Sequence, residues 1–196
     1  MKLAQVILVT LITVPVIAQD ARIEEIDKSP IEAEFSSGGQ LNLDLCSSGV
    51  ELKGIDHNIL RVSYHSERER TRNVKVLLET SGSRARINIT GCPHNNFWLT
   101  IEVPKSSNLY VRMFAGELQI RNVTGNKDVR LQAGQLTMDI GESGDYGRVE
   151  ASVTSGELEA PPFNVSKGGL FRSFDQTGPG KYYLHAHVGT GQLELR

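Results

Sequence analysis

Hydrophobic and polar residues alternate with a period of two along much of this chain. Leu109 and Val111 begin the clearest stretch, and the same spacing recurs within 129–133, 149–155 and 184–190. Successive side chains of a β-strand point to opposite faces, so this spacing predicts strands with one apolar face. No stretch of the sequence has a convincing helical period. The pattern therefore predicts an all-β fold.

A short phrase closes each of these alternating stretches. It consists of a small residue, Gly, Glu or Gln, Leu, a polar position and an apolar position. The four glycines, 18, 22 and 35 residues apart, are Gly116, Gly134, Gly156 and Gly191. The alternation continues after each glycine, and glycine lets the backbone bend without a Cβ penalty. Each unit is therefore predicted to be two short strands hinged at Gly.

One such unit cannot bury its apolar face alone, whereas copies stacked along an axis can. The phrase thus predicts a single-domain β-solenoid with about 18–22 residues per coil, spanning residues 35–196. Residues 19–34 form an N-terminal lead-in or cap in this prediction. A β-sandwich is the competing architecture, but its strands would not repeat one hinge phrase four times at the same phase.

The first half follows the same theme less regularly. Ser48 takes the hinge position, with Gly49 one residue later. Further strands are expected around 60–64, 74–78, 87–89 and 99–103. The Pro- and Gly-rich segment 161–181, which lies in the longest gap between hinge glycines, is expected to be an irregular coil or an inserted loop.

The N-terminus has the features of a secretory signal. Lys2 precedes an apolar run that ends at Val16, and cleavage is expected between Ala18 and Gln19. A retained membrane anchor is the competing interpretation, although the run is shorter than the ~20 residues of a spanning helix. Residues 1–18 are therefore predicted to be a signal peptide, with no transmembrane segment after cleavage. The product would be exported, to the periplasm or beyond the cell.

Export changes the interpretation of the two cysteines. Cys46 and Cys92 are the only pair in the chain, and in an oxidising compartment a pair most simply forms one disulfide. A metal-binding or catalytic thiol is the alternative, but neither cysteine belongs to a C-x-x-C motif. The charge composition argues against a nucleic-acid-binding protein. The 21 basic and 23 acidic residues leave a net charge of −2, without the basic excess of a nucleic-acid interface.

The hinge phrase, together with a signal peptide and a less regular first half, resembles the putative-adhesin β-solenoid domain of bacterial exported proteins. The resemblance covers about residues 35 to 196 and is best from Leu109 onward. That family is largely of unknown function and offers no catalytic residue to carry over. Its motif is a structural repeat, so the resemblance supports a fold more than an activity. The chain itself is predicted to be a cell-envelope or surface module that presents a polar face to a glycan or protein partner, without a cofactor.

Registering the units on their glycines predicts columns of outward-facing residues. The column directly after the hinge contains Glu117, Gln135, Glu157 and Gln192, which would be ~4.8 Å apart from coil to coil. It is interpreted as a surface polar ladder, with a cation- or sugar-binding strip as the alternative. Four residues before the hinge, Arg112 and Arg130 are candidates for contacts with acidic sugars or phosphates.

Other chemistry has weaker signals. His185 and His187 share one face of a predicted strand, but no third ligand lies nearby in the sequence, so no metal site is predicted. A carbohydrate-active β-helix enzyme is the alternative function, with Asp128, Asp139 and Asp145 as candidate acids. No catalytic motif supports it, so a non-enzymatic binding protein is predicted.

The chain also ends directly on the last unit. An uncapped final coil leaves an open strand edge, which predicts either self-association through the C-terminal coil or a cover formed by 161–181.

Overall fold

The computed structural model describes residues 22–25, 30–66, 74–91 and 97–196. Every long element in these ranges is a strand, and the only helical turns are two short 3-10 turns. The predicted all-β class is therefore confirmed for the described residues. None of these residues belongs to a helix long and apolar enough to cross a membrane. The elements are β1 (Arg22–Glu25), β2 (Ile31–Glu34), β3 (Gln40–Ile55), β4 (Ile59–Ser66), β5 (Lys75–Ser81), β6 (Arg84–Thr90), β7 (Phe97–Pro104), β8 (Asn108–Arg121), β9 (Lys127–Met138), η2 (Ser143–Asp145), β10 (Tyr146–Ala160), η3 (Pro161–Phe163), β11 (Val165–Thr177) and β12 (Tyr182–Leu195).

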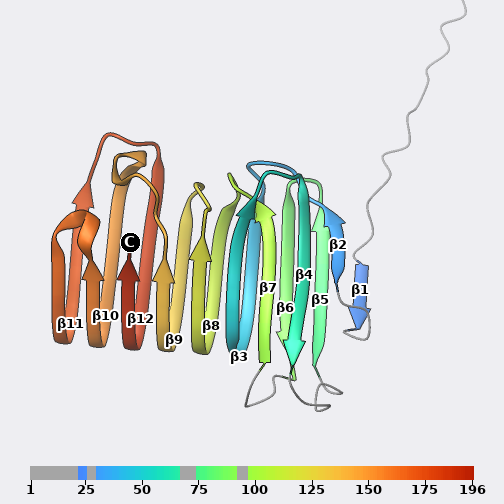
Figure 1. Ribbon diagram of the computed structural model, residues 1–196, viewed down its shortest axis with the longest axis horizontal. Helices are drawn as coiled ribbons and strands as arrows, with labels where there is room; N and C mark the ends of the chain where they lie inside the picture. Colours follow the sequence, from blue (N-terminus) through green and yellow to red (C-terminus); the bar gives the residue numbers. More distant parts are fainter. Residues whose placement is uncertain (1–21, 26–29, 67–73, 92–96) are drawn as a thin grey trace, which may run out of the picture.

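The strands belong to one mixed sheet, whose main path is β1-β5-β6-β3-β8-β9-β12-β10-β11 (Figure 1). The sheet does not close on itself. Within it, β3, β8, β9, β12 and β10 run parallel to one another, while β11 is antiparallel to β10. The closed coils of a β-solenoid are thus not what the structure shows. Instead, long bent strands stand side by side along the long axis.

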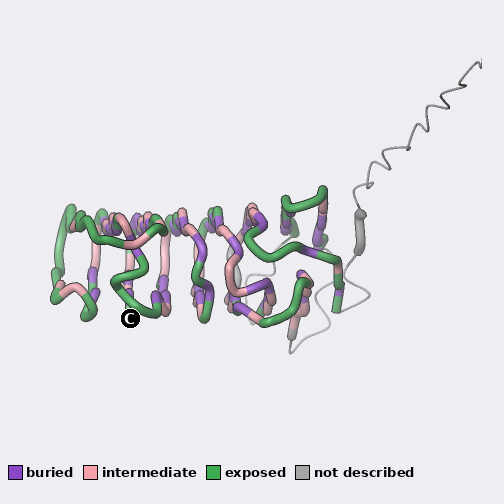
Figure 2. Tube along the Cα trace, turned by 90° about the horizontal axis from the view of Figure 1, so that it is seen from above, coloured by how far each residue is buried: buried purple, intermediate pink, exposed green. Residues whose placement is uncertain are grey.

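Each long parallel strand bends at the position that the hinge phrase predicts. In β8 the buried residues are odd-numbered up to Met113 and even-numbered from Leu118 onward. This change of parity keeps the apolar side of both arms directed at one shared interior. Figure 2 looks along the arms, which form two rows on the long axis. One hydrophobic core runs between them, from Ile31 to Leu195.

The hinge glycines lie in neighbouring register positions, but not in chain order. Gly116 pairs with Gly134, which pairs with Gly191, and Gly191 pairs with Gly156. A Cβ on Gly134 would lie 1.9 Å from the Gly116 carbonyl oxygen, and its φ of +130° is a conformation that L side chains rarely adopt. Successive units therefore do not stack in chain order, because β12 inserts between β9 and β10.

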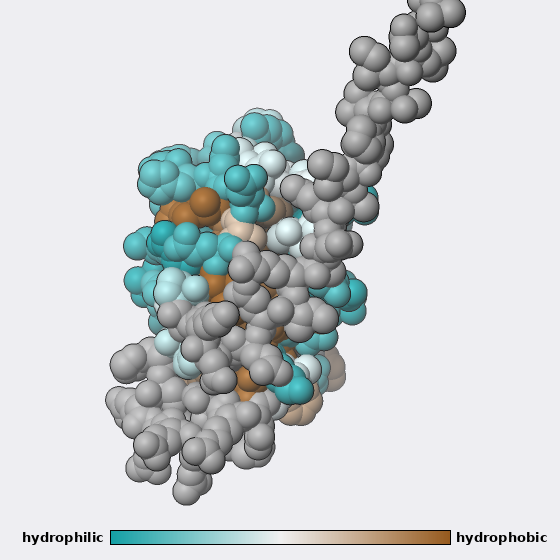
Figure 3. Space-filling view, turned by 90° about the vertical axis from the view of Figure 1, so that its right-hand side faces the viewer, coloured by the Kyte–Doolittle hydropathy of each residue, from teal (hydrophilic) through white to brown (hydrophobic). Residues whose placement is uncertain are grey.

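Beyond β3 the two rows of arms are formed by different strands. The first arm of β3 pairs with β6, and its second arm pairs with β7, so the sheet forks there. One branch continues through β5 to β1, and the other through β4 to β2. Figure 3 looks onto this end of the molecule and shows hydrophobic surface framed by hydrophilic surface. The strands expected around 60–64, 74–78, 87–89 and 99–103 are β4 to β7, so these predictions are confirmed.

Segment 161–181 is not the irregular loop that its composition suggested. It contains β11, a 13-residue strand paired with β10 along its whole length. Most β11 side chains are exposed on both faces, so no apolar alternation marked it in the sequence. This strand, not the C-terminal β12, is the last strand of the sheet. The prediction of an open C-terminal coil is therefore wrong, and the predicted cover by 161–181 takes the form of an added edge strand.

Two exposed cations of β11 lie at this end of the core. Lys167 pairs with the buried Leu158, and Arg172 with the buried Val153, so both side chains lie on the core side of the strand. The Lys167 ammonium donates to the Ser173 carbonyl oxygen, and the Arg172 Nε donates to that of Gly168, each at 2.7 Å. Inward-pointing charges of this kind protect a sheet edge against further strand addition.

Candidate functional site

The first arms of the long strands carry a polar outer face. Register places five of its residues side by side, one from each of β3, β8, β9, β12 and β10. We call this set the arginine row; its members are Asp44, Arg112, Arg130, His187 and Ser152. The sequence pattern had placed Arg112 and Arg130 in one column, and the structure brings them onto adjacent strands.

Two adjoining depressions lie along this row. The first, of about 360 Å³, includes Tyr110 and Asp128 among its lining residues. The second, of about 810 Å³, extends toward the bend and is lined in part by Phe114. Asp44, Arg112 and Arg130 line both depressions, so the two arginines lie where the depressions adjoin in one concave surface.

The charges around these arginines are unequally balanced. Arg130 lies 3.4 Å from an Asp128 carboxylate oxygen, and Arg86 lies 3.4 Å from one of Asp44. Within the described part of the chain, Arg112 has neither an ion-pair nor a hydrogen-bond partner. Arg112 is exposed, with its guanidinium donors available to a ligand. The middle of the arginine row can therefore accept an anionic group.

The two histidines are held by different partners. His185 Nδ1 lies 2.9 Å from Asp128 Oδ1, and His187 Nδ1 lies 2.9 Å from the Ser152 hydroxyl. Burial lowers the pKa of His187, and the positive charges of His185 and Arg130 lower it further. The described ranges contain no group of three or more His, Cys, Asp and Glu side chains suited to a metal ion. The histidine pair therefore belongs to a hydrogen-bond network on the sheet surface.

Tyr183 extends this network toward β10. Its ring stacks on His185 with 6.4 Å between centroids, and its hydroxyl donates to Glu150 at 2.6 Å. Burial, followed by the Glu150 carboxylate, raises the pKa of Tyr183 to about 12. The phenol is thus a hydrogen-bond donor at neutral pH, and it fixes the outer face next to the arginine row.

The predicted Glu/Gln ladder exists on the second arms, but in a different order. From β8 to β10 its members are Glu117, Gln135, Gln192 and Glu157. The chain order Glu117, Gln135, Glu157, Gln192 is not kept across the sheet, because the insertion of β12 makes the two glutamines neighbours. Gln192 Nε2 donates to Glu157 at 2.7 Å, while Glu117 accepts from Gln119 at 2.5 Å.

The three candidate acids for hydrolysis do not share a site. Of the three, only Asp128 lines the concave surface at the arginine row. Arg196 Nε donates to Asp139 at 2.7 Å, and Asp145 lies in the η2 turn. Glycoside hydrolysis needs two carboxyl groups that flank one bond. The arrangement of these aspartates supplies no such pair.

Two predictions fall partly or wholly outside the described residues. Cys46 is half-buried against the core, but Cys92 is outside the described ranges, so the disulfide stays a prediction. The proposed cleavage between Ala18 and Gln19 also lies outside them.

Two notable residues escaped the sequence interpretation. Lys127 is fully buried, and its amino group donates to the Tyr146 hydroxyl at 2.7 Å. A signal was present, since Lys127 has the parity of the core residues Val129 and Leu131. Trp98 is the second of the two; it is 42% exposed and lies on the outer face of β7, between the buried Phe97 and Leu99. Its outward parity could have been read from the sequence, but its neighbour across the sheet could not.

Comparisons with known proteins leave the family unassigned. The sequence matches no protein-family model, and no curated protein matches it. A solved structure described as a "putative cell adhesion protein" from Clostridium sporogenes is 13% identical, covering 85% of this chain and 99% of its own, with a TM-score of 0.40. Another, a "putative adhesin" from Parabacteroides merdae, is 8% identical, covering 86% and 95%, with a TM-score of 0.23. These names agree with the adhesin resemblance, but scores this low carry no inference about fold or function.

Proposed function

We propose that this chain is an exported, non-enzymatic, adhesin-like module of the bacterial cell envelope, and that its arginine row binds acidic polysaccharide. Its stack of hinged strands would act as an open variant of a β-solenoid and display a long polar face. The observation that carries the proposal is the position of Arg112 and Arg130 on adjacent strands, where the two depressions adjoin in one concave surface.

The chemistry of the row favours an anionic sugar. A guanidinium group presents a planar set of donors that matches a carboxylate or phosphate, and charge-assisted bonds of this kind are stronger than neutral ones. The aspartates near the row have their own cationic or histidine partners, so they do not cancel the charge of Arg112. Tyr110, 44% exposed beside it, adds an aromatic surface for the body of a sugar ring.

Binding of polygalacturonate to the purified chain, with dextran as the uncharged comparison, tests the proposal. We expect saturable binding of polygalacturonate that weakens as salt is added, because exposed charges are screened. The double variant Arg112→Gln/Arg130→Gln should bind about tenfold more weakly or worse, since charged hydrogen bonds contribute about 1.5–3 kcal/mol each.

The matched control removes two positive charges elsewhere. Lys53 and Lys181 are exposed and do not line the concave surface, so Lys53→Gln/Lys181→Gln should bind within about twofold of the unchanged chain. Equal loss in both variants would mean that only net charge matters and would overturn the proposed site. Release of reducing ends from polygalacturonate would favour the carbohydrate-active enzyme instead.

A further inference from the structure

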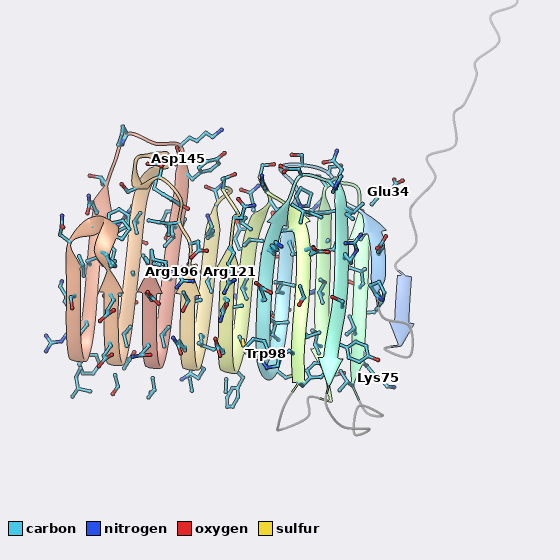
Figure 4. All side chains as sticks on the ribbon, viewed as in Figure 1. Glu34, Lys75, Trp98, Arg121, Asp145 and Arg196 are labelled. Carbon is cyan, nitrogen blue, oxygen red and sulfur yellow. The ribbon has the colours of Figure 1, made fainter. Side chains whose placement is uncertain are left out.

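A single tryptophan lies flat on the outer face of the second arms. Trp98, the second residue of β7, stands directly across from Gly49 of β3 (Figure 4). A Cβ built on Gly49, which would point away from the sheet, would meet three indole atoms at 2.6–2.7 Å. The ring therefore lies over Gly49 with the sheet beneath it. Its opposite side faces solvent, in keeping with the 42% of Trp98 that is exposed.

Register continues from this ring into a row of hydrogen-bonding side chains. We call it the tryptophan row; across β7, β3, β8, β9, β12 and β10 it contains Trp98, Gly49, Glu117, Gln135, Gln192 and Glu157. Neighbouring strands in a sheet are ~4.8 Å apart, so the row is a regular series of polar groups that begins at an aromatic platform. Glycine at the second position is what allows the indole to lean over the sheet.

The charge of this row is opposite to that of the arginine row. It contains two carboxylates and two amides, and none of its six residues carries a positive charge. A depression of about 120 Å³ at its β10 end is lined by further acids, Glu159 and Glu194, as well as by Glu157. An acidic sugar would be repelled here, whereas sugar hydroxyl groups can donate to carboxylates and exchange hydrogen bonds with amides.

We propose that the tryptophan row binds an uncharged glycan chain, with one pyranose ring stacked on the exposed face of Trp98. The negative face of an aromatic ring attracts the weakly positive C–H bonds on one side of a pyranose. The following sugars would lie along Glu117, Gln135 and Gln192 and bond to them through their hydroxyl groups. This site goes beyond the function proposed above, since it uses the other face of the molecule and an uncharged ligand.

Intrinsic fluorescence gives a direct test, because Trp98 is the only tryptophan of the chain. Cellohexaose, mannohexaose and maltohexaose are each titrated into the full chain. At least one should cause a saturable change in emission, while polygalacturonate should not compete. Gln135→Ala/Gln192→Ala, which leaves the fluorophore in place, should bind about tenfold more weakly through the loss of two hydrogen bonds. Gln132→Ala, an amide on β9 outside the row, is the matched control and should bind normally.

An aromatic ring over a cross-strand glycine can also serve packing alone. Trp98→Phe separates the two roles, because it keeps a ring over Gly49 but offers a smaller platform. The affinity for the oligosaccharide, measured by calorimetry, should fall, while the melting temperature of the protein should change little. If none of the three oligosaccharides changes the emission up to about 10 mM, the row is a packing feature and the inference is overturned. Binding of polygalacturonate that persists in that case would leave the arginine row unaffected.

Discussion

Replacing Lys127 by methionine should remove a pH dependence from the stability of this fold. The lysine is fully buried, and its Nζ donates to the Tyr146 hydroxyl at 2.7 Å and to the Gly125 carbonyl oxygen at 3.1 Å. Burial lowers its pKa from 10.5 to about 7, with partial opposition from the charge of Asp145. Methionine fills a similar volume with an unbranched chain. Tyr146 would still donate to the Ile140 carbonyl oxygen, at 3.1 Å.

The sign of the effect follows from the proton balance. Below the folded pKa of about 7, both states hold the proton, and the full cost of a buried charge is present. Between about 7 and 10.5 the unfolded chain binds the proton while the folded chain does not, so the free energy of unfolding rises with pH. The slope approaches about 1.4 kcal/mol per pH unit, and the whole difference in pKa corresponds to roughly 5 kcal/mol.

Urea unfolding at several pH values between 6 and 9 measures this slope. From pH 7 to 9 the unchanged chain should gain about 2–3 kcal/mol relative to Lys127→Met. Measurements stop at about pH 9 because Tyr146, whose pKa burial raises, adds an opposite effect once an unfolded tyrosine ionises near pH 10. Lys53→Met, at an exposed position, is the control and should run parallel to the unchanged chain. Parallel curves for Lys127→Met would refute the reasoning.

Two further predictions concern the bends and the edge. Gly134→Ala should lower the free energy of unfolding by about 3 kcal/mol or more, because its Cβ would lie 1.9 Å from a carbonyl oxygen at a φ of +130°. The control Gly144→Ala, with nothing within 4 Å of its Cβ, should change it by no more than about 0.5 kcal/mol in the same urea assay. Equal unfolding midpoints for the two variants would contradict this prediction. Lys167→Leu/Arg172→Leu should create an apolar edge on β11 and cause dimerisation, visible by light scattering, and a strictly monomeric variant would show that these charges do not guard the edge.

Much of the local structure could be predicted from residue order. The period of two placed the long strands, and the small-Gly phrase placed their bends, because both depend on local geometry that a few residues decide. Even the burial of Lys127 could be predicted, because Lys127 lies at the same alternate positions as the buried Val129. Strand β11 could not be predicted from the alternation, because it lies at the exposed end of the stack and most of its side chains are exposed, so no apolar period of two marks it.

The sequence by itself determined which residues point inward, where each strand bends, and that Arg112 and Arg130 occupy equivalent positions on their strands. Only the tertiary structure decided which strand lies beside which. The units at β9, β10 and β12 carry nearly the same phrase, so local sequence does not distinguish one parallel neighbour from another; packing along the whole strand does. The order β9-β12-β10, the glutamine neighbours it creates, and the meeting of Trp98 with Gly49 all depend on contacts between residues far apart in the chain.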